Sequence, residues 1–399
     1  LMPQGNRIAG ASYAARRYFK KPLEDVSWAE AAFLAGLPKA PGEMNPFTFS
    51  GFENGKNRAR LVLTLLHEQG YLDEEEYAVA NEQLTYMSIP VLEERPPFAV
   101  HYILKTIQEF DRLTKDDIKR PIRTSLDWGI QLKLQGFAEE AIEKWRPLGA
   151  GNIAILVAEV ATGDVVGYVG SDNYFDTEHK GAIDYVQVKR SSGSTLKPFL
   201  YARGLEKRAF TPASIIPDLP IHLLSENGEF VVRNHDNIYL GPLLYRRALA
   251  NSRNVAAVRV LEGVGASDCF DTLKRLGLLD GEHPLEWYGY GLILGGVYVS
   301  LEQLVQAYGV LANDGRSFEL SYFADTRTDS GKEQIIDPYA VREISLFLSD
   351  PLSRLPSFQR LEGLEIPFPA AIKTGTSQGY RDAWAIAYSR KYVVGVWIG

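Results

Sequence analysis

Three short motifs follow one another along this chain, and together they constrain its fold more than any other feature. They are Ser194-Thr195-Leu196-Lys197, Ser252-Arg253-Asn254 and Lys373-Thr374-Gly375-Thr376, which read as S-x-x-K, S-x-N and K-T-G. Each motif alone is weak, because S-x-x-K occurs by chance about once or twice in a chain of this length. Their order and local contexts together predict one site, built around a serine nucleophile and a lysine base.

The first motif brings a serine and a lysine together if its segment is helical. Residues three apart lie on one face of a helix, so Ser194 and Lys197 would meet. Pro198 is tolerated only near a helix start, which places Ser194 in the first turn, where the helix dipole favours developing negative charge. Gly193 allows a substrate to approach the backbone closely. Taken alone, the motif also fits an N-cap serine followed by an exposed lysine.

A lysine acts as a base only in its neutral form. The ordinary pKa of lysine is about 10.4, so work near pH 7 requires that pKa to fall by ~3, on the order of 4 kcal/mol. Burial of Lys197 and a second cation beside it, Lys373, would both lower the pKa. The sequence therefore predicts that Lys197 is buried and that Lys373 lies near it.

The second motif supplies a hydroxyl and an amide. The Ser252 hydroxyl can relay a proton between the base and a leaving nitrogen, and the Asn254 amide can hold a peptide carbonyl. An S-x-N motif is almost uninformative by itself, and residues 171–173 also spell S-D-N. That segment precedes the first motif and follows a hairpin predicted at residues 153–169, so we reject it and interpret Asn173 as a turn residue.

The third motif lies on a predicted strand. A strand edge offers backbone N–H groups to an extended peptide. Gly375 removes a side chain where a ligand must lie close. Lys373 and the hydroxyls of Thr374 and Thr376 suit a carboxylate. The motif therefore predicts a groove for a peptide that carries a free carboxylate.

Composition excludes several other classes of site. The chain has 399 residues, enough for two or three domains, and a net charge of −7, which argues against nucleic acid as the main partner. Its six histidines show no metal-ligand spacing and it has no P-loop, so we expect neither a metal nor a cofactor. Cys269 is the only cysteine, which rules out an internal disulfide and suggests a buried structural thiol.

Hydrophobic periodicity predicts helices in the first part of the chain and strands from residue 152 onward. Ser27 with Glu30 forms a capping box, and a Gly/Asn-rich loop is expected at 51–57. Helices are predicted within 11–35, at 57–70, after 73, near 98–111, at 127–145 and through much of 194–320. Strands are predicted at 153–160, 165–169, 370–373, 383–388 and 392–398. This order indicates an α/β domain with a mostly antiparallel sheet between helices.

These motifs make the chain resemble the class A penicillin-binding proteins, the bifunctional peptidoglycan synthases, and most of all their 1C type. The resemblance covers nearly the whole chain, and the motif set is also shared with class A β-lactamases. Residues 192–199 resemble the acylation motif of the family, with Ser192 where proline is usual, and residues 373–385 are similar to the 1C form of the third motif. Residues 124–127 with Gln131 resemble the strand that enters the transpeptidase domain.

The resemblance also implies a domain order. Residues 1–83 look like a helical, C-terminal remnant of a lysozyme-like glycosyltransferase family 51 domain, and residues 84–150 a linker region. Residues 151–399 would then form a β-lactamase-like serine transpeptidase domain, truncated at its C-terminus. The catalytic glutamates of the glycosyltransferase and the membrane anchor would lie upstream, so we expect a fragment that polymerises no glycan.

By the same resemblance, each motif residue has a role. Ser194 is the acylated nucleophile, Lys197 its base and Ser252 a proton shuttle, while Lys373 supports the site.

The substrate is bound by the neighbouring residues of the second and third motifs. Asn254 binds the peptide, and Thr374, Gly375 and Thr376 hold its terminal carboxylate. The backbone N–H groups of Ser194 and Thr376 form the oxyanion hole.

The implied activity is a D,D-transpeptidase that cross-links peptidoglycan stem peptides through an acyl-serine intermediate. Its partners would be D-Ala-D-Ala stem peptides and β-lactam antibiotics, with lipid II only in a full-length protein, at the periplasmic or extracytoplasmic face of the bacterial membrane. Two alternatives stay open: a D,D-carboxypeptidase or β-lactamase-type hydrolase, and a non-catalytic peptidoglycan-binding scaffold.

Overall fold

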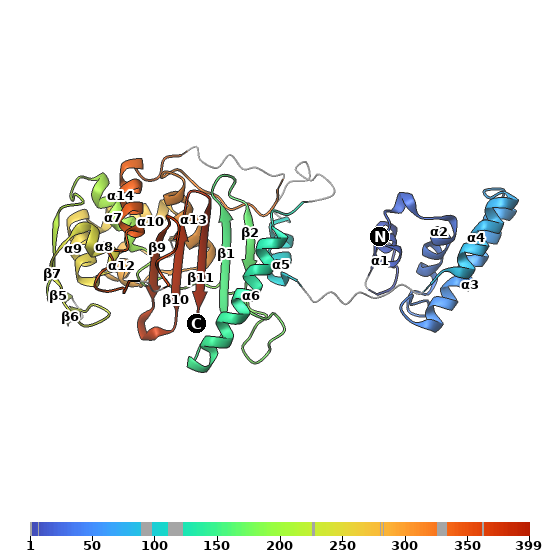
Figure 1. The fold of residues 1–399 in the computed structure, drawn as a ribbon, viewed down its shortest axis with the longest axis horizontal. Coiled ribbons are helices and arrows are strands. Elements are labelled where there is room, and N and C mark those ends of the chain that lie inside the picture. Colours follow the sequence, from blue (N-terminus) through green and yellow to red (C-terminus); the bar gives the residue numbers. More distant parts are fainter. Residues whose placement is uncertain are drawn as a thin grey trace. The chain divides into compact units, whose positions relative to one another are not determined.

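The structure is a computed structural model and divides into two compact units, Leu1–Phe98 and Ala99–Gly399 (Figure 1). The structure describes residues 2–6, 8–88, 98–110, 123–225, 228–279, 281, 283–324, 333–360 and 363–399. Side chains of residues 223–231 are outside that description. Among the described residues, no helix is both long and apolar enough to cross a membrane.

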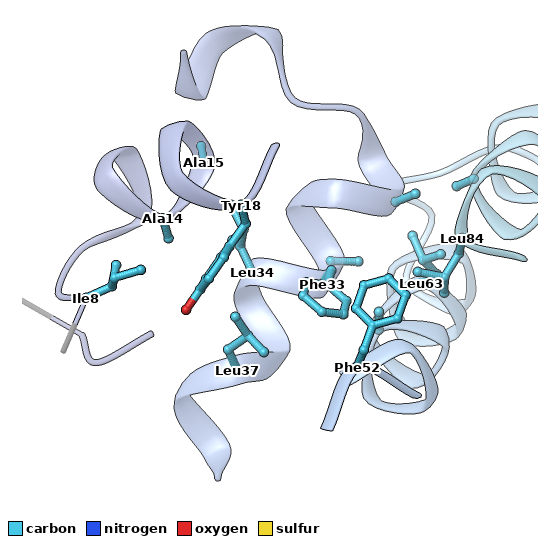
Figure 2. Packing of buried hydrophobic residues seen from close by; sticks show 14 of the residues in the cluster. Ile8, Ala14, Ala15, Tyr18, Phe33, Leu34, Leu37, Phe52, Leu63 and Leu84 are labelled. Carbon is cyan, nitrogen blue, oxygen red and sulfur yellow. The ribbon is translucent and has the colours of Figure 1, made fainter. Parts of the chain in front are cut away.

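The first unit is helical. Its α-helices are α1 (Ala11–Phe19), α2 (Trp28–Gly36), α3 (Phe49–Glu68) and α4 (Glu74–Tyr86), with single 3₁₀ turns at Leu23–Asp25 and Leu37–Lys39. The predicted capping box of Ser27 and Glu30 starts α2, and Asp73 with Glu76 starts α4 in the same way. Figure 2 shows the core, where the ring of Phe33 on α2 lies beside that of Phe52 on α3, with 5.4 Å between the ring centroids.

One sequence-based prediction fails in this unit. The stretch 51–57, expected to be a loop, lies inside α3, which begins at Phe49 with Thr48 as its N-cap. A Cβ on Gly55 would lie 2.7 Å from the Phe33 ring, and one on Gly51 would lie 2.4 Å from the Asn45 carbonyl oxygen. The glycines are therefore where the helix packs most closely, and tertiary contact outweighs their poor helix propensity.

The second unit is built on a five-stranded antiparallel sheet in the order β2-β1-β11-β10-β9 (Figure 1). Its strands are β1 (Ile153–Glu159), β2 (Val165–Val169), β9 (Ala371–Thr376), β10 (Ala383–Tyr388) and β11 (Tyr392–Ile398). All five agree with the predicted strands to within a few residues. The K-T-G motif lies on β9, which is at one edge of the sheet.

Helices cover both faces of this sheet. One face, with Ile155 and Val157, packs on α6 (Trp128–Trp145). On the other face, α13 (Leu301–Ala312) packs so closely that a Cβ on Gly395 would lie 2.6 Å from Val305. Burial on both faces explains why β1 is a continuous apolar run rather than an alternating one.

The expected linker region at 84–150 differs from the observed division. Helices α5 (Val100–Phe110) and α6 pack against β2 and belong to the second unit, which begins at Ala99. Gln131 of α6 exchanges hydrogen bonds with the backbone N–H and carbonyl of Tyr168, at 2.7 and 2.8 Å. Residues 124–127 form an isolated bridge and the N-cap of α6 rather than a full strand.

The predicted helical middle is correct only in part. Its helices are α7 (Lys197–Glu206), α8 (Tyr245–Ala250), α9 (Asn254–Val264), α10 (Ala266–Arg275), α11 (Leu285–Tyr288), α12 (Gly291–Leu294) and α13, and α14 (Pro338–Ser349) follows. Small two-stranded sheets interrupt them. Their strands pair as β3 (Arg190–Ser191) with β8 (Tyr298–Val299), β4 (Ile215–Asp218) with β7 (Gly241–Leu244), and β5 (Ile221–Ser225) with β6 (Gly228–Val232). Short 3₁₀ turns lie at Arg146–Leu148 and Gln378–Tyr380.

Candidate active site

Ser194 lies in the turn that leads into α7, not in the first turn of that helix as the sequence predicted. The α-helix begins at Lys197, and the preceding turn is closed by hydrogen bonds from the Thr195 N–H to the Ser192 carbonyl (3.1 Å) and from the Lys197 N–H to the Ser194 carbonyl (3.4 Å). The Tyr308 hydroxyl on α13 donates to the Thr195 carbonyl at 2.5 Å. The nucleophile turn, residues 192–197, is therefore held by its own backbone hydrogen bonds and by a buried contact from α13.

Two glycines allow this turn to lie directly against the end of β9. Gly193 has a φ of 53°, and a Cβ there would lie 2.6 Å from the Thr376 carbonyl oxygen. A Cβ on Gly375 would lie 2.6 Å from the Thr195 methyl carbon. The glycine of the third motif thus makes room for the nucleophile turn, and not for a ligand as its sequence context predicts.

Lys197 is fully buried, and its hydrogen-bond partners within the described part of the chain are neutral groups. Its Nζ donates to the Ser252 carbonyl at 2.6 Å and to Asn254 Oδ1 at 2.7 Å. Burial lowers the pKa of Lys197 well below its usual value, and the positive charges of Lys373 and Arg253 lower it further. A neutral amine has two N–H groups and one lone pair. Both N–H groups are used here, which leaves the lone pair to accept a proton.

Lys373 is the second buried amine of the site. Its Nζ donates to Ser252 Oγ at 2.8 Å and to the Thr374 carbonyl at 2.7 Å. Burial, with a contribution from the charge of Arg354, lowers the pKa of Lys373 to about 7. Ser252 adopts a left-handed φ of 56° and links the two lysines, because its carbonyl faces Lys197 and its hydroxyl faces Lys373.

Asn254 is partly engaged by the protein itself. Its Oδ1 accepts the bond from Lys197, and its Nδ2 donates to the Arg233 carbonyl at 2.9 Å. The amide group has two N–H bonds, so one is left for a ligand. Asn254 also begins α9, whose first N–H groups are capped by Asn234 Oδ1 from another loop, at 2.8 Å from the Asn254 nitrogen.

All of the predicted site residues except the two buried lysines line one cavity of about 550 Å³. They are Ser194, Ser252, Asn254, Thr374, Gly375 and Thr376. Thr376 is exposed and Thr374 half-buried, so their hydroxyl groups lie at the cavity wall. The structure thus brings the three motifs together at the edge of the sheet, with both amines buried beneath the cavity.

The groups that hold the S-x-N motif in place were not predicted from the sequence. Arg253, the middle residue of that motif, is buried and donates to Asp218 at 2.9 Å and to Asp236 at 2.7 Å. Arg354, which helps lower the pKa of Lys373, donates to the Leu348 and Leu364 carbonyls. Isolated charged residues in loops carry no pattern that marks them as buried, so the sequence held no signal for them.

Residues 171–173 do not reach the cavity, in agreement with their rejection as a motif. The Asn173 side chain accepts a hydrogen bond from the Phe175 N–H at 3.0 Å, the bond that defines an Asx-turn. Ser171 donates to the Gly181 carbonyl. Cys269 is a buried free thiol, and burial raises its pKa to about 12. These observations confirm both interpretations.

Comparison with known proteins identifies the family. The family model "Penicillin binding protein transpeptidase domain" matches residues 153–399, and the model "Transglycosylase" matches residues 1–67. Penicillin-binding protein 1C of Escherichia coli is 31% identical over all of this chain, and penicillin-binding protein 1A of Streptococcus oralis is 28% identical. The chain spans 48% of the first relative and 66% of the second.

A solved structure extends the likeness to the fold. The crystal structure of penicillin-binding protein 1A from Haemophilus influenzae aligns with 100% of this chain and 79% of its own, with a TM-score of 0.69 at 18% identity. That likeness agrees with the antiparallel sheet, its covering helices and the helical first unit. Together with the family-model matches to both regions, it shows that the chain belongs to the class A penicillin-binding proteins.

Proposed function

We propose that the second unit is a D,D-transpeptidase that acts through an acyl-serine intermediate on Ser194. The observation that carries this proposal is the state of Lys197, a buried amine with a lowered pKa, neutral hydrogen-bond partners and a place in the same motif as Ser194. Such a group can accept a proton near neutral pH, which is what a serine nucleophile requires.

Acylation would begin with transfer of the Ser194 hydroxyl proton to Lys197. The serine oxygen then forms a bond to the penultimate D-alanine carbonyl carbon of the donor peptide. As the peptide C–N bond breaks, the leaving amine takes a proton. Ser252 supports a relay for that proton, because its hydroxyl accepts from Lys373 at 2.8 Å and its carbonyl binds Lys197.

The oxyanion would be stabilised by the backbone N–H groups of Ser194 and Thr376. Support comes from the packing of Gly193, since the absence of its side chain lets the nucleophile turn contact the Thr376 backbone. The terminal carboxylate of the donor would meet the hydroxyls of Thr374 and Thr376 on the edge strand, while the peptide extends along β9 past Asn254. Edge strands bind extended peptides in this way.

Labelled penicillin followed by peptide mapping tests the proposal. We expect a single adduct on Ser194 and none in Ser194→Ala. An adduct on Ser252, or one that survives in Ser194→Ala, would show that the nucleophile is wrongly assigned. The scaffold alternative predicts no adduct at all.

The hydrolase alternative requires a carboxylate base for deacylation. Among the described residues that line the Ser194 cavity, Asp236 alone carries a carboxylate. It forms an ion pair with Arg253. Although partial burial opposes the shift, hydrogen bonds including that from Arg253 hold the pKa of Asp236 below its usual value, so it is a weak base.

The sequence between residues 200 and 240 contains three glutamates, none of them in a recognisable deacylation motif. Glu206 bonds to Arg203 and to the Asp337 N–H, outside the cavity lining. Glu226 lies outside the described residues, as does the side chain of Glu229. We therefore expect a slowly hydrolysed acyl-enzyme, and release of bound label at about 1 per second or faster would favour a β-lactamase instead.

For the whole protein, we propose peptidoglycan stem peptides and β-lactams as ligands and the extracytoplasmic face of the bacterial membrane as its place. The match of residues 1–67 to the transglycosylase model supports lipid II as a ligand of a protein with a complete domain of that kind.

A further inference from the structure

A buried ion pair adjoins the two groups that hold the amine of Lys197. Arg253 and Asp218 are joined at 2.9 Å, and their side chains are 3% and 0% exposed. Arg253 stands in the chain between Ser252 and Asn254, whose oxygens accept the hydrogen bonds of the amine. Because desolvation offsets much of the attraction between buried charges, such a pair is poor evidence of stability alone. What the pair holds in place is its more informative property.

Arg253 fixes the peptide group that carries the Ser252 carbonyl. The N–H of this peptide group belongs to Arg253 and donates to the Ala248 carbonyl at 3.1 Å. The Arg253 guanidinium reaches Asp218 and, at 2.7 Å, Asp236. Ser252 has a left-handed φ of 56°, and a non-glycine residue keeps such a conformation only where its surroundings hold it. The Arg253 side chain is therefore an anchor for the strained residue that precedes it.

Asp218 reaches Asn254 by a second route, through the side chain of Asn234. Asp218 Oδ1 accepts a hydrogen bond from Asn234 Nδ2 at 2.8 Å. Since only the NH₂ group of an amide can donate to a carboxylate, this contact leaves Asn234 Oδ1 free to accept. That oxygen accepts from the Asn254 N–H at 2.8 Å and from the Val255 N–H at 3.3 Å. The start of α9, which carries the Asn254 side chain to Lys197, therefore depends on Asp218.

We propose that Arg253 and Asp218 are a positioning pair for the base Lys197. The pair fixes the Ser252 carbonyl and Asn254 Oδ1 at hydrogen-bond distance from the amine. With both of its N–H groups held in this way, the neutral amine keeps its lone pair for the proton of the serine nucleophile. The inference rests on the proposed function, in which Lys197 is the base.

The two charges of the pair act on Lys197 in opposite directions. The Arg253 charge lowers the pKa of Lys197 and the Asp218 charge raises it, with the larger effect from Arg253. Lys373 on β9 also lowers that pKa, while the charge of Arg354 acts on Lys373. Breaking the pair from either side loosens the same turn but removes charges of opposite sign. A purely structural role would therefore move the pKa of the base in the same direction in both variants.

The test measures the rate of acylation by penicillin against pH in Asp218→Asn, Arg253→Gln and the double variant. In each single variant we expect the plateau rate to fall by about 10- to 100-fold, the scale of a misplaced catalytic group. The acid limb should move to lower pH in Asp218→Asn and to higher pH in Arg253→Gln, each by about 1 pH unit, the scale of one neighbouring charge. Asp268→Asn is the matched control, because it removes the carboxylate that lies 2.7 Å from Arg203 on α7. Its profile should match that of the wild type.

The direction of the two shifts decides the inference. Shifts in the same direction in both single variants, or plateau rates within about twofold of wild type in both, would overturn it. The double variant leaves neither charge buried without its partner, so it carries the test if circular dichroism shows that Arg253→Gln does not fold. Its plateau should stay at least about 10-fold below wild type, and a wild-type plateau there would also overturn the inference. Failure of penicillin to acylate the wild type would refute the proposed function instead.

Discussion

The described part of the second unit buries lysines on α5 and near the Ser194 cavity. The lysine on α5 is paired with carboxylates, whereas the two near the cavity have neutral partners. Lys105 of α5 is paired with Glu109 at 3.1 Å and Glu302 at 3.0 Å. Lys197 and Lys373 instead donate hydrogen bonds to carbonyl, amide and hydroxyl oxygens. Burial without a counter-charge favours the neutral amine, whereas an ion pair favours the ammonium form. In this protein the partner of a buried lysine, more than its burial, marks the candidate catalytic site.

Replacing Lys197 should lower the acylation rate more than any other change considered, and it tests directly whether the two kinds of buried lysine differ. Removal of a general base typically costs 10²- to 10⁴-fold in rate, so we expect Lys197→Met to lower the rate of acylation by penicillin by about that factor. The rate is measured by stopped-flow or by gel detection of fluorescent penicillin. Lys105→Met is the matched control and should retain acylation within about threefold. A similar loss of acylation rate in both variants would show that a buried lysine without a counter-charge does not differ in function from an ion-paired one.

Lys373→Ala should have the next largest effect. Loss of a charge-assisted contact is worth about 1.5–3 kcal/mol, roughly 10- to 150-fold in acylation rate. The charge of Lys373 lowers the pKa of Lys197, so its removal raises that pKa. The acid limb of the pH–rate profile should therefore move to higher pH. A rate within about twofold of wild type would remove Lys373 from the mechanism.

The paired lysines should instead affect stability. Lys105→Met leaves two partly buried carboxylates without their cation, and we expect a loss of about 3 kcal/mol in the free energy of unfolding. Lys56→Met in the first unit should cost less than about 1 kcal/mol, because the partner of Lys56, Glu53, is 40% exposed. Denaturant unfolding followed separately in each unit by hydrogen exchange measures both. A larger loss for Lys56→Met would contradict the dependence on partner burial.

The lowered pKa of Lys373 also predicts a dependence of stability on pH. Between its folded pKa of about 7 and the ordinary 10.5, the unfolded chain binds a proton that the folded site does not. The unfolding free energy should therefore rise with pH across this window, by up to about 1.4 kcal/mol per pH unit. The penalty is fully present below pH 7 and is gone above 10.5. Wild type should show this slope relative to Lys373→Met, and parallel curves would mean that Lys373 stays charged.

Local sequence predicted much of the secondary structure. Alternation and apolar runs predicted the five strands of the sheet, and capping residues such as Ser27 predicted helix starts. The failures share one cause, which is contact between distant segments. Gly51 and Gly55 favour a loop until Phe33 and Asn45 pack against them in α3. The strands β4 and β7 pair across a gap in sequence that contains other strands, so no local pattern marks them.

The residues that meet in the site could be named from the order of the motifs alone, because nucleophile, base, relay and carboxylate-binding groups need particular side chains. The charge on those groups depends instead on how the chain folds. The pKa of Lys197 depends on burial and on the positions of Lys373, Arg253 and Asp218. Those positions arise when β4, α9 and β9 converge, and Coulomb interactions depend on distance in space rather than along the chain.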